Sequence, residues 1–147
     1  MRAILQRVSS ASVSIDGILT GKIQKGLVLF LGIGIEDKPK DVEYVIDKSV
    51  QIRIFSDENG KMNLSVQDVN GEILVISQFT LYGSTRKGRR PSFNRAASPQ
   101  QAKPLYQLAV ERLRQHNIHV VTGSFGADME ISLVNCGPVT LTIDSES

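Results

Sequence analysis

The feature that most constrains the fold is a nearly unbroken apolar segment that runs from Gly26 to Ile35. It is bounded by glycines and falls well short of the ~20 residues that a bilayer-spanning helix needs. A short apolar run between chain breakers is typical of a strand buried inside a globular protein. We therefore expect a central strand over residues 27–33 and no membrane-spanning segment.

The size and composition of the chain predict one domain. With 147 residues it is long enough to bury a sizeable core, and 41% hydrophobic with 22% charged residues is ordinary for a water-soluble protein. No repeat or linker divides the sequence, so we expect a single domain over residues 1–147. Disorder is expected only in the polar tail, residues 144–147.

Alternating apolar and polar residues predict further strands. The Asp16-Gly17 pair favours a hairpin turn, because both residues tolerate positive φ. The segment from Glu72 to Tyr82 has the strongest strand pattern in the sequence. The expected strands cover residues 3–8, 11–15, 18–23, 27–33, 72–82, 118–121, 130–134 and 139–143.

Two segments repeat apolar residues with the period of a helix. The first is expected to be capped by Asp37, with Pro39 in its opening turn. The second opens over residues 98–101 with a serine N-cap, a proline and the glutamine of a capping box, although Pro104 favours a later start, near Lys103. Many strands and two main helices, not in strict alternation, predict an α+β fold: mixed or antiparallel β-sheets forming a barrel-like core.

The sequence predicts a cytoplasmic protein without a metal. The N-terminal residues lack the apolar stretch of a signal peptide, and the one cysteine, Cys136, cannot form an internal disulfide. His116 and His119 lie near the expected end of the second helix, where the helix dipole favours an exposed histidine, and no ligand cluster accompanies them. Cys136 has no neighbouring base, so we expect neither a thiol nucleophile nor a cofactor.

The strand that begins at Glu72 changes character at Ser77-Gln78-Phe79-Thr80. Strand alternation places Gln78 and Thr80 on one face and Ser77 and Phe79 on the other. A buried amide beside a hydroxyl needs hydrogen-bond partners, since an unpaired buried polar group costs about 1–3 kcal/mol. The segment is either a candidate site or a strand end emerging into solvent, and taken alone it favours the second.

Gly137-Pro138 interrupts the last expected strands. Proline cannot donate a ladder hydrogen bond, so it belongs at the start or the edge of a strand. A cis bond before proline costs only about 0.5–1 kcal/mol and would fix two carbonyls in an unusual direction. The alternative, and the commoner case, is a trans proline that simply opens the strand over residues 139–143.

A cationic loop follows the unusual strand. Residues 86–90 hold four cations, Arg86, Lys87, Arg89 and Arg90, although the formal net charge of the chain is only +2. Such a run is usually a solvated surface, but beside a candidate site it also fits the positioning of nucleic-acid phosphates. Aromatic residues make up only 5% of the chain, so sequence-specific reading of bases is not indicated.

General bases are scarce throughout the sequence. It has two histidines, one cysteine and no paired-carboxylate motif. Either the chain is not an enzyme, or its chemistry relies on backbone donors and on groups of the substrate.

Taken as a pair, Ser77-Gln78-Phe79-Thr80-Leu81 and Asn135-Cys136-Gly137-Pro138-Val139-Thr140 resemble the signature of D-aminoacyl-tRNA deacylases. Residues 6–8, 53–57, 60–63 and 90–93 agree with the same family, so the resemblance extends from Met1 to about Ile143. It implies hydrolysis of the ester that joins a D-amino acid to the 3′ acceptor end of tRNA. Removal of glycine mischarged on tRNA-Ala is implied as well.

The resemblance further implies a homodimer with its active site at the subunit interface. In the family a cis Gly-Pro motif of one subunit enters the pocket of the other. Here Gly137 and Pro138 would exclude an L side chain with their carbonyls, and Arg7 would hold their orientation. The implied catalytic residues are Ser77, Gln78, Phe79 and Thr80, and the expected contacts to tRNA phosphates are Arg86, Lys87, Arg89 and Arg90.

The implied mechanism suits a site without a general base. The 2′-hydroxyl of the terminal adenosine would assist attack by water, and backbone N–H groups near Phe79 and Thr80 would stabilise the oxyanion. Thr80 has been considered a nucleophile in the family, but with no base in view we expect it to position the substrate. The rival hypotheses are a non-catalytic tRNA-binding module that uses the cationic loop and a general esterase with Ser77 or Thr80 as nucleophile.

Overall fold

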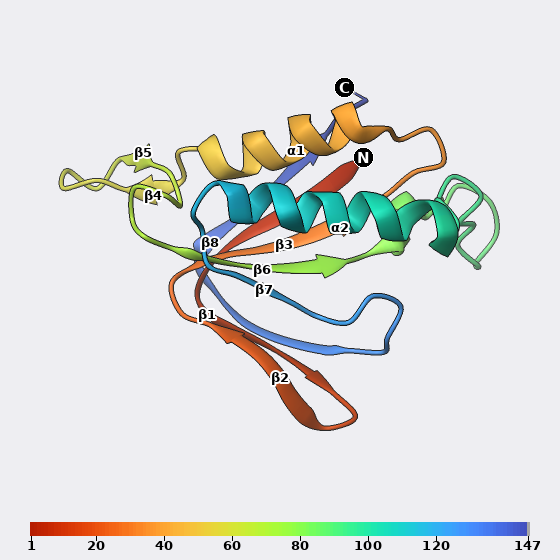
Figure 1. Cartoon of the computed structure of the whole chain (residues 1–147), viewed down its shortest axis with the longest axis horizontal. Helices are drawn as coiled ribbons and strands as arrows, with labels where there is room; N and C mark the ends of the chain where they lie inside the picture. Colours follow the sequence, from red (N-terminus) through yellow and green to blue (C-terminus); the bar gives the residue numbers. More distant parts are fainter. Residues whose placement is uncertain (147) are drawn as a thin grey trace.

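A curved mixed sheet forms the body of the molecule in the computed structural model, which describes residues 1–146 (Figure 1). Its strands are β1 (Arg2–Ile15), β2 (Ile18–Ile23), β3 (Gly26–Gly32), β6 (Glu72–Ser77), β7 (Val120–Thr122) and β8 (Glu130–Asp144). β1 pairs antiparallel with β2, β3 and β8, whereas β3, β6 and β7 are parallel. β2 and β7 lie at opposite ends of the pairing order, yet a Cβ on Gly21 would come within 2.5 Å of Val121. The sheet is therefore nearly closed into a barrel, and the expected α+β class is confirmed.

Two helices, α1 (Pro39–Gln51) and α2 (Pro99–Gln115), lie side by side on one face of this sheet (Figure 1). Side chains such as Leu29, Ile46 and Leu113 form the core between helices and sheet. Val28 and Leu74 point to the other face and pack in a second cluster inside the curl. β3 is thus covered on both faces, which confirms the central strand predicted from its apolar run.

The second helix begins where its capping sequence indicates. The Ser98 hydroxyl accepts a hydrogen bond from the N–H of Gln101 (3.3 Å), and α2 starts at Pro99. The alternative start near Lys103 is wrong. Pro104 removes a single backbone hydrogen bond inside the helix, which the cap and the packing of the helix on the core outweigh.

The cap predicted for the first helix is wrong by one residue. Lys38 is the N-cap of α1, and its N–H donates to the carboxylate of Asp41 (2.8 Å). Asp37 instead accepts hydrogen bonds from the α-ammonium group of Met1 (2.5 Å) and from the N–H of Gly34 (2.7 Å). A buried carboxylate is stable only when it is paired, so this tertiary contact takes precedence over the cap.

Two pairs of predicted strands are each one long strand. The segments 3–8 and 11–15 are both part of β1, and 130–134 and 139–143 are both part of β8. Opposite β1, Gln6 aligns with Thr140 and Val8 with Asn135. Residues 136–139 therefore face Arg7 alone and bulge out of the ladder. The Gly-Pro pair lies inside a bulge and does not separate two strands.

The strand predicted over residues 72–82 ends early, at Ser77. Phe79–Tyr82 forms a 3₁₀ helix, η1, so the predicted alternation of side chains over residues 77–80 is wrong. The N–H of Gln78 still donates to the carbonyl of Leu31 (2.8 Å), but β3 ends at Gly32 and offers no further partner. The chain then forms hydrogen bonds within itself, starting with Leu81 N–H to the Gln78 carbonyl (3.3 Å).

Smaller departures concern the connections and the tail. A short hairpin of β4 (Phe55–Ser56) and β5 (Met62–Leu64) follows α1, and β7 starts two residues later than expected. The tail was expected to be disordered, yet Ser145 N–H donates to the Met1 carbonyl (2.9 Å). Ser147 lies outside the described residues. In the part of the chain that the structure describes, no helix combines the length and apolarity needed to cross a bilayer.

Candidate active site

A cavity of about 680 Å³ opens where β6 ends and η1 begins. Ser77, Gln78 and Phe79, three of the four residues expected to be catalytic, line it. The remaining walls come from segments far apart in the sequence: Ile33, Ile76, Phe93, Ala96, Ala97, Pro99, Ala102, Phe125, Gly126, Ala127, Asp128, Met129 and Ile131. The end of the parallel strand thus opens into a largely apolar, concave site, as ligand sites commonly do.

Close packing fixes the η1 wall of the cavity. The rings of Phe79 and Phe93 meet edge to face, with centroids 5.2 Å apart. On the opposite side a Cβ on Gly34 would come within 2.7 Å of the Tyr82 ring, so this glycine lets the ring lie directly on the backbone. Burial, and then the charge of Asp37, raise the pKa of Tyr82, which keeps its phenol protonated.

Thr80 is not among the residues that line the cavity. It is exposed on η1, and its hydroxyl accepts a hydrogen bond from the side-chain amide of Gln78 (2.6 Å). Thr80 therefore orients Gln78, which does line the cavity. Thr80 thus contacts the cavity through Gln78 and not with its own side chain.

The cavity has little acid–base chemistry of its own. Asp128 is the single ionisable residue among those that line it within residues 1–146. The two histidines lie elsewhere. The Nε2 atom of His116 is 3.1 Å from Oδ1 of Asp47, and that of His119 is 3.4 Å from Oε2 of Glu72. No cluster of three or more potential metal ligands occurs among the described residues. The polar groups available to a substrate are the Ser77 hydroxyl, the Gln78 amide, the Asp128 carboxylate and backbone donors.

Arg7 and Gly137-Pro138 lie together, but not at the cavity of the same chain. Arg7 donates to the carbonyls of Cys136 (3.0 Å) and Ile54 (2.6 Å). Gly137 and Pro138 are exposed, their peptide bond is cis, and Gly137 has φ +129°. That φ is one that residues with a side chain rarely adopt, and a Cβ at this position would also come within 2.9 Å of the Val139 side chain, so glycine is favoured here.

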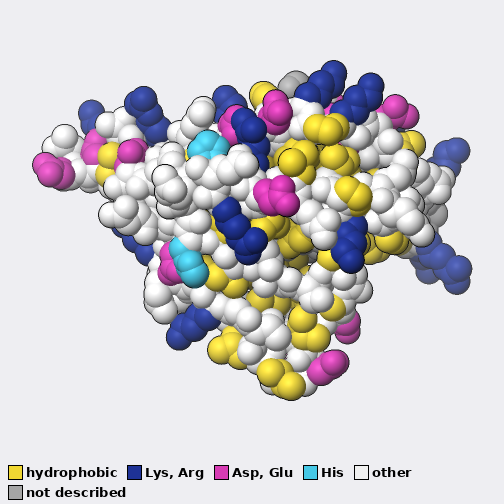
Figure 2. Space-filling view, viewed as in Figure 1, with side chains coloured by type: hydrophobic (Ala, Val, Ile, Leu, Met, Phe, Trp, Pro, Cys, Tyr) yellow, Lys and Arg dark blue, Asp and Glu magenta, His cyan; other side chains and the backbone are white. Residues whose placement is uncertain are grey.

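The cationic loop is exposed from Ser84 to Arg90. Lys and Arg side chains project at the right edge of Figure 2, where Figure 1 places the loop after η1. Arg86 and Lys87 line a second, smaller hollow of about 290 Å³ beside the cavity, whereas Arg89 and Arg90 are not among its lining residues. Tyr82 of η1 lines the same hollow, so Arg86 and Lys87 lie near that turn.

Sequence reasoning did not single out most of the cavity walls. Phe93 appeared only within a stretch that supported the resemblance, and residues 125–129 carried no recognisable motif. A glycine-containing loop with Phe125 and Met129 between two strands was the available indication. This loop becomes part of the candidate site only because the fold brings it to the end of β6.

Comparisons with known proteins agree over nearly the whole chain. A family model described as D-Tyr-tRNA(Tyr) deacylase matches residues 4–144. The D-aminoacyl-tRNA deacylase of Thermosipho africanus is 53% identical over 146 residues, covering 99% of this chain and 98% of that protein. The enzyme of the same name from Bacillus cytotoxicus is also 53% identical, covering 99% of this chain and 100% of its own length.

Two solved structures have the same fold. One, described as c-Myc DNA Unwinding Element Binding Protein, has a TM-score of 0.93 and 39% sequence identity, and 99% of each chain is covered. The other, described as a probable eukaryotic D-amino acid tRNA deacylase, has a TM-score of 0.81 at 15% identity, with 97% of each chain covered. At that identity the second likeness concerns the fold alone.

Proposed function

The chain belongs to the D-Tyr-tRNA(Tyr) deacylase family and is a D-aminoacyl-tRNA hydrolase, and we propose that it cleaves the ester in the cavity at the end of β6. The observation that carries this proposal is the position of Ser77, Gln78 and Phe79. They belong to the segment that resembles the family signature, and all three line the cavity. The ester carbonyl would lie beside η1, and the terminal adenosine would occupy the apolar part of the cavity.

The proposed reaction is hydrolysis without a covalent enzyme intermediate. Water attacks the ester carbonyl, the bond to the ribose 3′-oxygen breaks, and the products are the D-amino acid and tRNA. The ribose 2′-hydroxyl assists the attack, since the cavity has no histidine among its described lining residues. The hydrogen bonds within η1 begin at Leu81, so the N–H groups of Phe79 and Thr80 are not used inside the turn. They are our candidates for stabilising the oxyanion.

Chiral selection is proposed to come from Gly137 and Pro138 of a partner subunit. On one chain this pair is exposed and does not line the cavity, which fits insertion into a second copy. Their carbonyls would occupy the space of an L side chain and reject it by steric and electrostatic conflict. Arg7 supports the arrangement because it holds the Cys136 carbonyl at the start of the bulge. The active site would then be complete only in a homodimer.

A gate of this kind excludes L side chains without recognising D side chains. It therefore accepts many D-amino acids, and also glycine, which has no side chain to exclude. We propose glycine mischarged on tRNA-Ala as a second substrate on this ground. Arg86, Lys87, Arg89 and Arg90 would contact phosphates of the bound tRNA, and the protein would act in the cytoplasm.

The decisive experiment compares D- and L-aminoacyl-tRNA of one identity as substrates. We expect the D ester to be cleaved and the L ester to persist, with glycyl-tRNA cleaved as well. Binding of tRNA without loss of either ester would support the non-catalytic module instead. Cleavage of simple esters, with inhibition by serine-directed reagents, would support a general esterase that uses Ser77 or Thr80.

A further inference from the structure

The hollow beside the cavity shares a wall with it. Tyr82, Ser84, Ser92, Asn94 and Arg95 line the hollow together with Arg86 and Lys87. The cavity is lined by their chain neighbours Phe79, Phe93 and Ala96. Arg95, one of three cations that line the hollow, is adjacent in the chain to Ala96 of the cavity wall. Ser84 and Ser92 exchange backbone hydrogen bonds of 2.7 and 2.9 Å, which fixes the base of the cationic loop.

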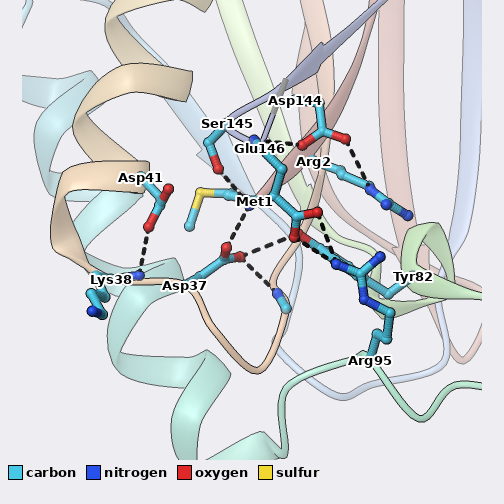
Figure 3. Close-up of polar contacts among 11 residues, drawn as sticks. Met1, Arg2, Asp37, Lys38, Asp41, Tyr82, Arg95, Asp144, Ser145 and Glu146 are labelled. Atoms are coloured by element: carbon cyan, nitrogen blue, oxygen red, sulfur yellow. Dashed lines mark hydrogen bonds and ion pairs between the residues drawn. The ribbon is translucent and has the colours of Figure 1, made fainter.

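Of these three cations, Arg95 alone has an acidic partner among residues 1–146. Its Nη2 donates to both carboxylate oxygens of Glu146, at 2.8 and 2.9 Å (Figure 3). The backbone of Arg95 is fixed, since its carbonyl accepts the N–H of Ile35 (3.1 Å). The guanidinium also lies over the Tyr82 ring, 5.9 Å from its centroid. Arg95 is thus held at the wall between the hollow and the cavity.

The ion pair between Arg95 and Glu146 can be displaced. The two side chains are 57% and 38% exposed, and exposed ion pairs contribute little to stability because water screens both charges. A phosphate offers the same guanidinium two anionic oxygens in a similar geometry. A nucleic-acid phosphate would therefore compete with Glu146 for the same guanidinium.

We propose that this hollow binds a phosphate of the 3′ strand of tRNA, with Arg95 as the ligand beside the cavity and Glu146 as a carboxylate that the RNA displaces. The inference rests on the proposed function, which brings the 3′ end of tRNA into the adjacent cavity. It adds Arg95 to the cations of the loop and assigns Glu146 a competing role. Glu146 competes for Arg95 and so lowers the affinity for tRNA, because a phosphate must displace its carboxylate to bind.

The test measures binding of deacylated tRNA, which requires no ester cleavage. Glu146→Gln should tighten binding about threefold, because a neutral amide competes weakly for the guanidinium. Arg95→Gln should weaken binding and lower the slope of log affinity against log salt by about 0.7, as expected for one lost contact to a single strand. Glu36→Gln is the matched control, because Glu36 is exposed and adjoins Ile35, whose N–H binds the Arg95 carbonyl.

Combining the substitutions separates displacement from a general charge effect. In the Arg95→Gln background, Glu146→Gln should have no more effect than Glu36→Gln. Equal effects of Glu146→Gln and Glu36→Gln in the parent protein would overturn the proposal, and so would weaker binding by Glu146→Gln. A competition experiment at constant ionic strength adds inorganic phosphate to the bound tRNA. If about 1 mM phosphate displaces the tRNA, the hollow is a site for free phosphate and the proposal is wrong.

The proposed function fails on different evidence. If D-aminoacyl-tRNA is not cleaved while the Arg95 and Glu146 variants change tRNA binding as expected, the proposed hydrolysis is wrong and the phosphate site remains. If the ester is cleaved but Glu146→Gln matches Glu36→Gln, only the phosphate site is wrong. Thermal unfolding of each variant identifies any that has lost its fold.

Discussion

Single side chains hold the Gly137-Pro138 bulge in place from both sides. Arg7 donates to the carbonyl of Cys136 on one side. Across the bulge, the side-chain carbonyl of Asn135 accepts the N–H of Val139 (3.0 Å), and its amide donates to the Thr140 hydroxyl (2.8 Å). These contacts bridge the residues that leave the ladder with β1, where neighbouring strands no longer hold the backbone.

Replacing Asn135 should therefore lower the preference for D over L substrates more than it lowers the rate of ester hydrolysis. Asn135→Ala removes the two hydrogen bonds of the Asn135 side chain, each worth about 1 kcal/mol, and leaves that of Arg7. We expect the ratio of kcat/KM for D- over L-aminoacyl-tRNA to fall up to about tenfold, with hydrolysis of the D ester largely kept. Gln67→Ala is the control, since it loses a side-chain bond to the His116 carbonyl far from the bulge. An unchanged ratio would remove Asn135 from the gate.

Thr80 gives a second prediction at this scale. Its hydroxyl orients Gln78 and does not line the cavity, so Thr80→Ala should retain activity, with a loss of about tenfold, corresponding to one hydrogen bond. Asp128→Asn, at the one ionisable lining residue of the described chain, should have a similarly small effect. Single-turnover hydrolysis measures both. Complete loss in Thr80→Ala, or a trapped acyl-enzyme, would make Thr80 the nucleophile instead.

Among the elements, η1 depends on the end of β3. Two glycines of this region let the turn approach: a Cβ on Gly32 would come within 2.8 Å of Leu81, and one on Gly34 within 2.7 Å of the Tyr82 ring. Arg2 adds a hydrogen bond to the Leu81 carbonyl (3.2 Å). The η1 wall of the cavity is thus positioned by the packing of Leu81 and Tyr82 on the side away from the cavity.

Gly34→Ala should destabilise the fold by about 1–3 kcal/mol, the usual cost of overpacking, and lower kcat because η1 moves. Urea unfolding and single-turnover hydrolysis measure the two effects. In a Tyr82→Leu background, where the ring is absent, the added methyl should cost much less. If both backgrounds lose the same stability, the contact between Gly34 and Tyr82 is not the cause.

The buried phenol of Tyr106 joins helix α2 to the sheet, and its ionisation should make the free energy of unfolding depend on pH. Tyr106 donates to the carbonyl of Val75 (3.1 Å), and burial raises its pKa from 10.0 to about 12. The folded pKa is above the unfolded one, so this stability is present below pH 10 and is lost as the pH rises toward 12.

We expect the free energy of unfolding in urea to fall between about pH 10 and 12, with part of the fall absent in Tyr106→Phe. Tyr82, whose pKa is also raised, contributes to the same alkaline loss. Tyr44→Phe is the control, because Tyr44 is 46% exposed on α1. A Tyr106→Phe protein with the full alkaline loss would contradict the assignment.

For the whole molecule, the exposed apolar residues support the proposed homodimer. Val134 is 56% exposed on β8, just before the Gly-Pro bulge, and Leu19 is 57% exposed in β2. Both line a shallow hollow on the face of β1 and β8. A second copy that inserted its bulge into the cavity would cover part of this surface.

Sedimentation analysis is expected to give twice the mass of one chain. Val134→Lys should weaken the dimer and lower deacylation in parallel, because a charge at an apolar interface is costly to bury. Tyr44→Lys adds the same charge on α1, and we expect it to leave the dimer intact. Full activity in a strictly monomeric protein would exclude an active site that needs a partner.

The sequence by itself determined the elements whose stabilising interactions are local. The Ser98 capping box, the Asp16-Gly17 hairpin turn and the apolar run of β3 each act over a few residues, and the structure contains all three. The family resemblance was likewise readable from short segments, because it rests on the order of residues. Ser77, Gln78 and Phe79, which line the cavity, are therefore predicted from the sequence as candidate site residues.

Only the tertiary structure decided where those residues lie and what surrounds them. The strand pattern continued to Tyr82, but β6 ends at Ser77 because β3 offers no partner beyond Gly32. Asp37 had the position of a helix cap, yet it binds the ammonium group of Met1, just before the start of β1. Cavity walls near residues 93, 102 and 129 meet Ser77 through strand register and helix packing. Such contacts depend on the closure of the whole sheet, and no local pattern in the sequence contains them.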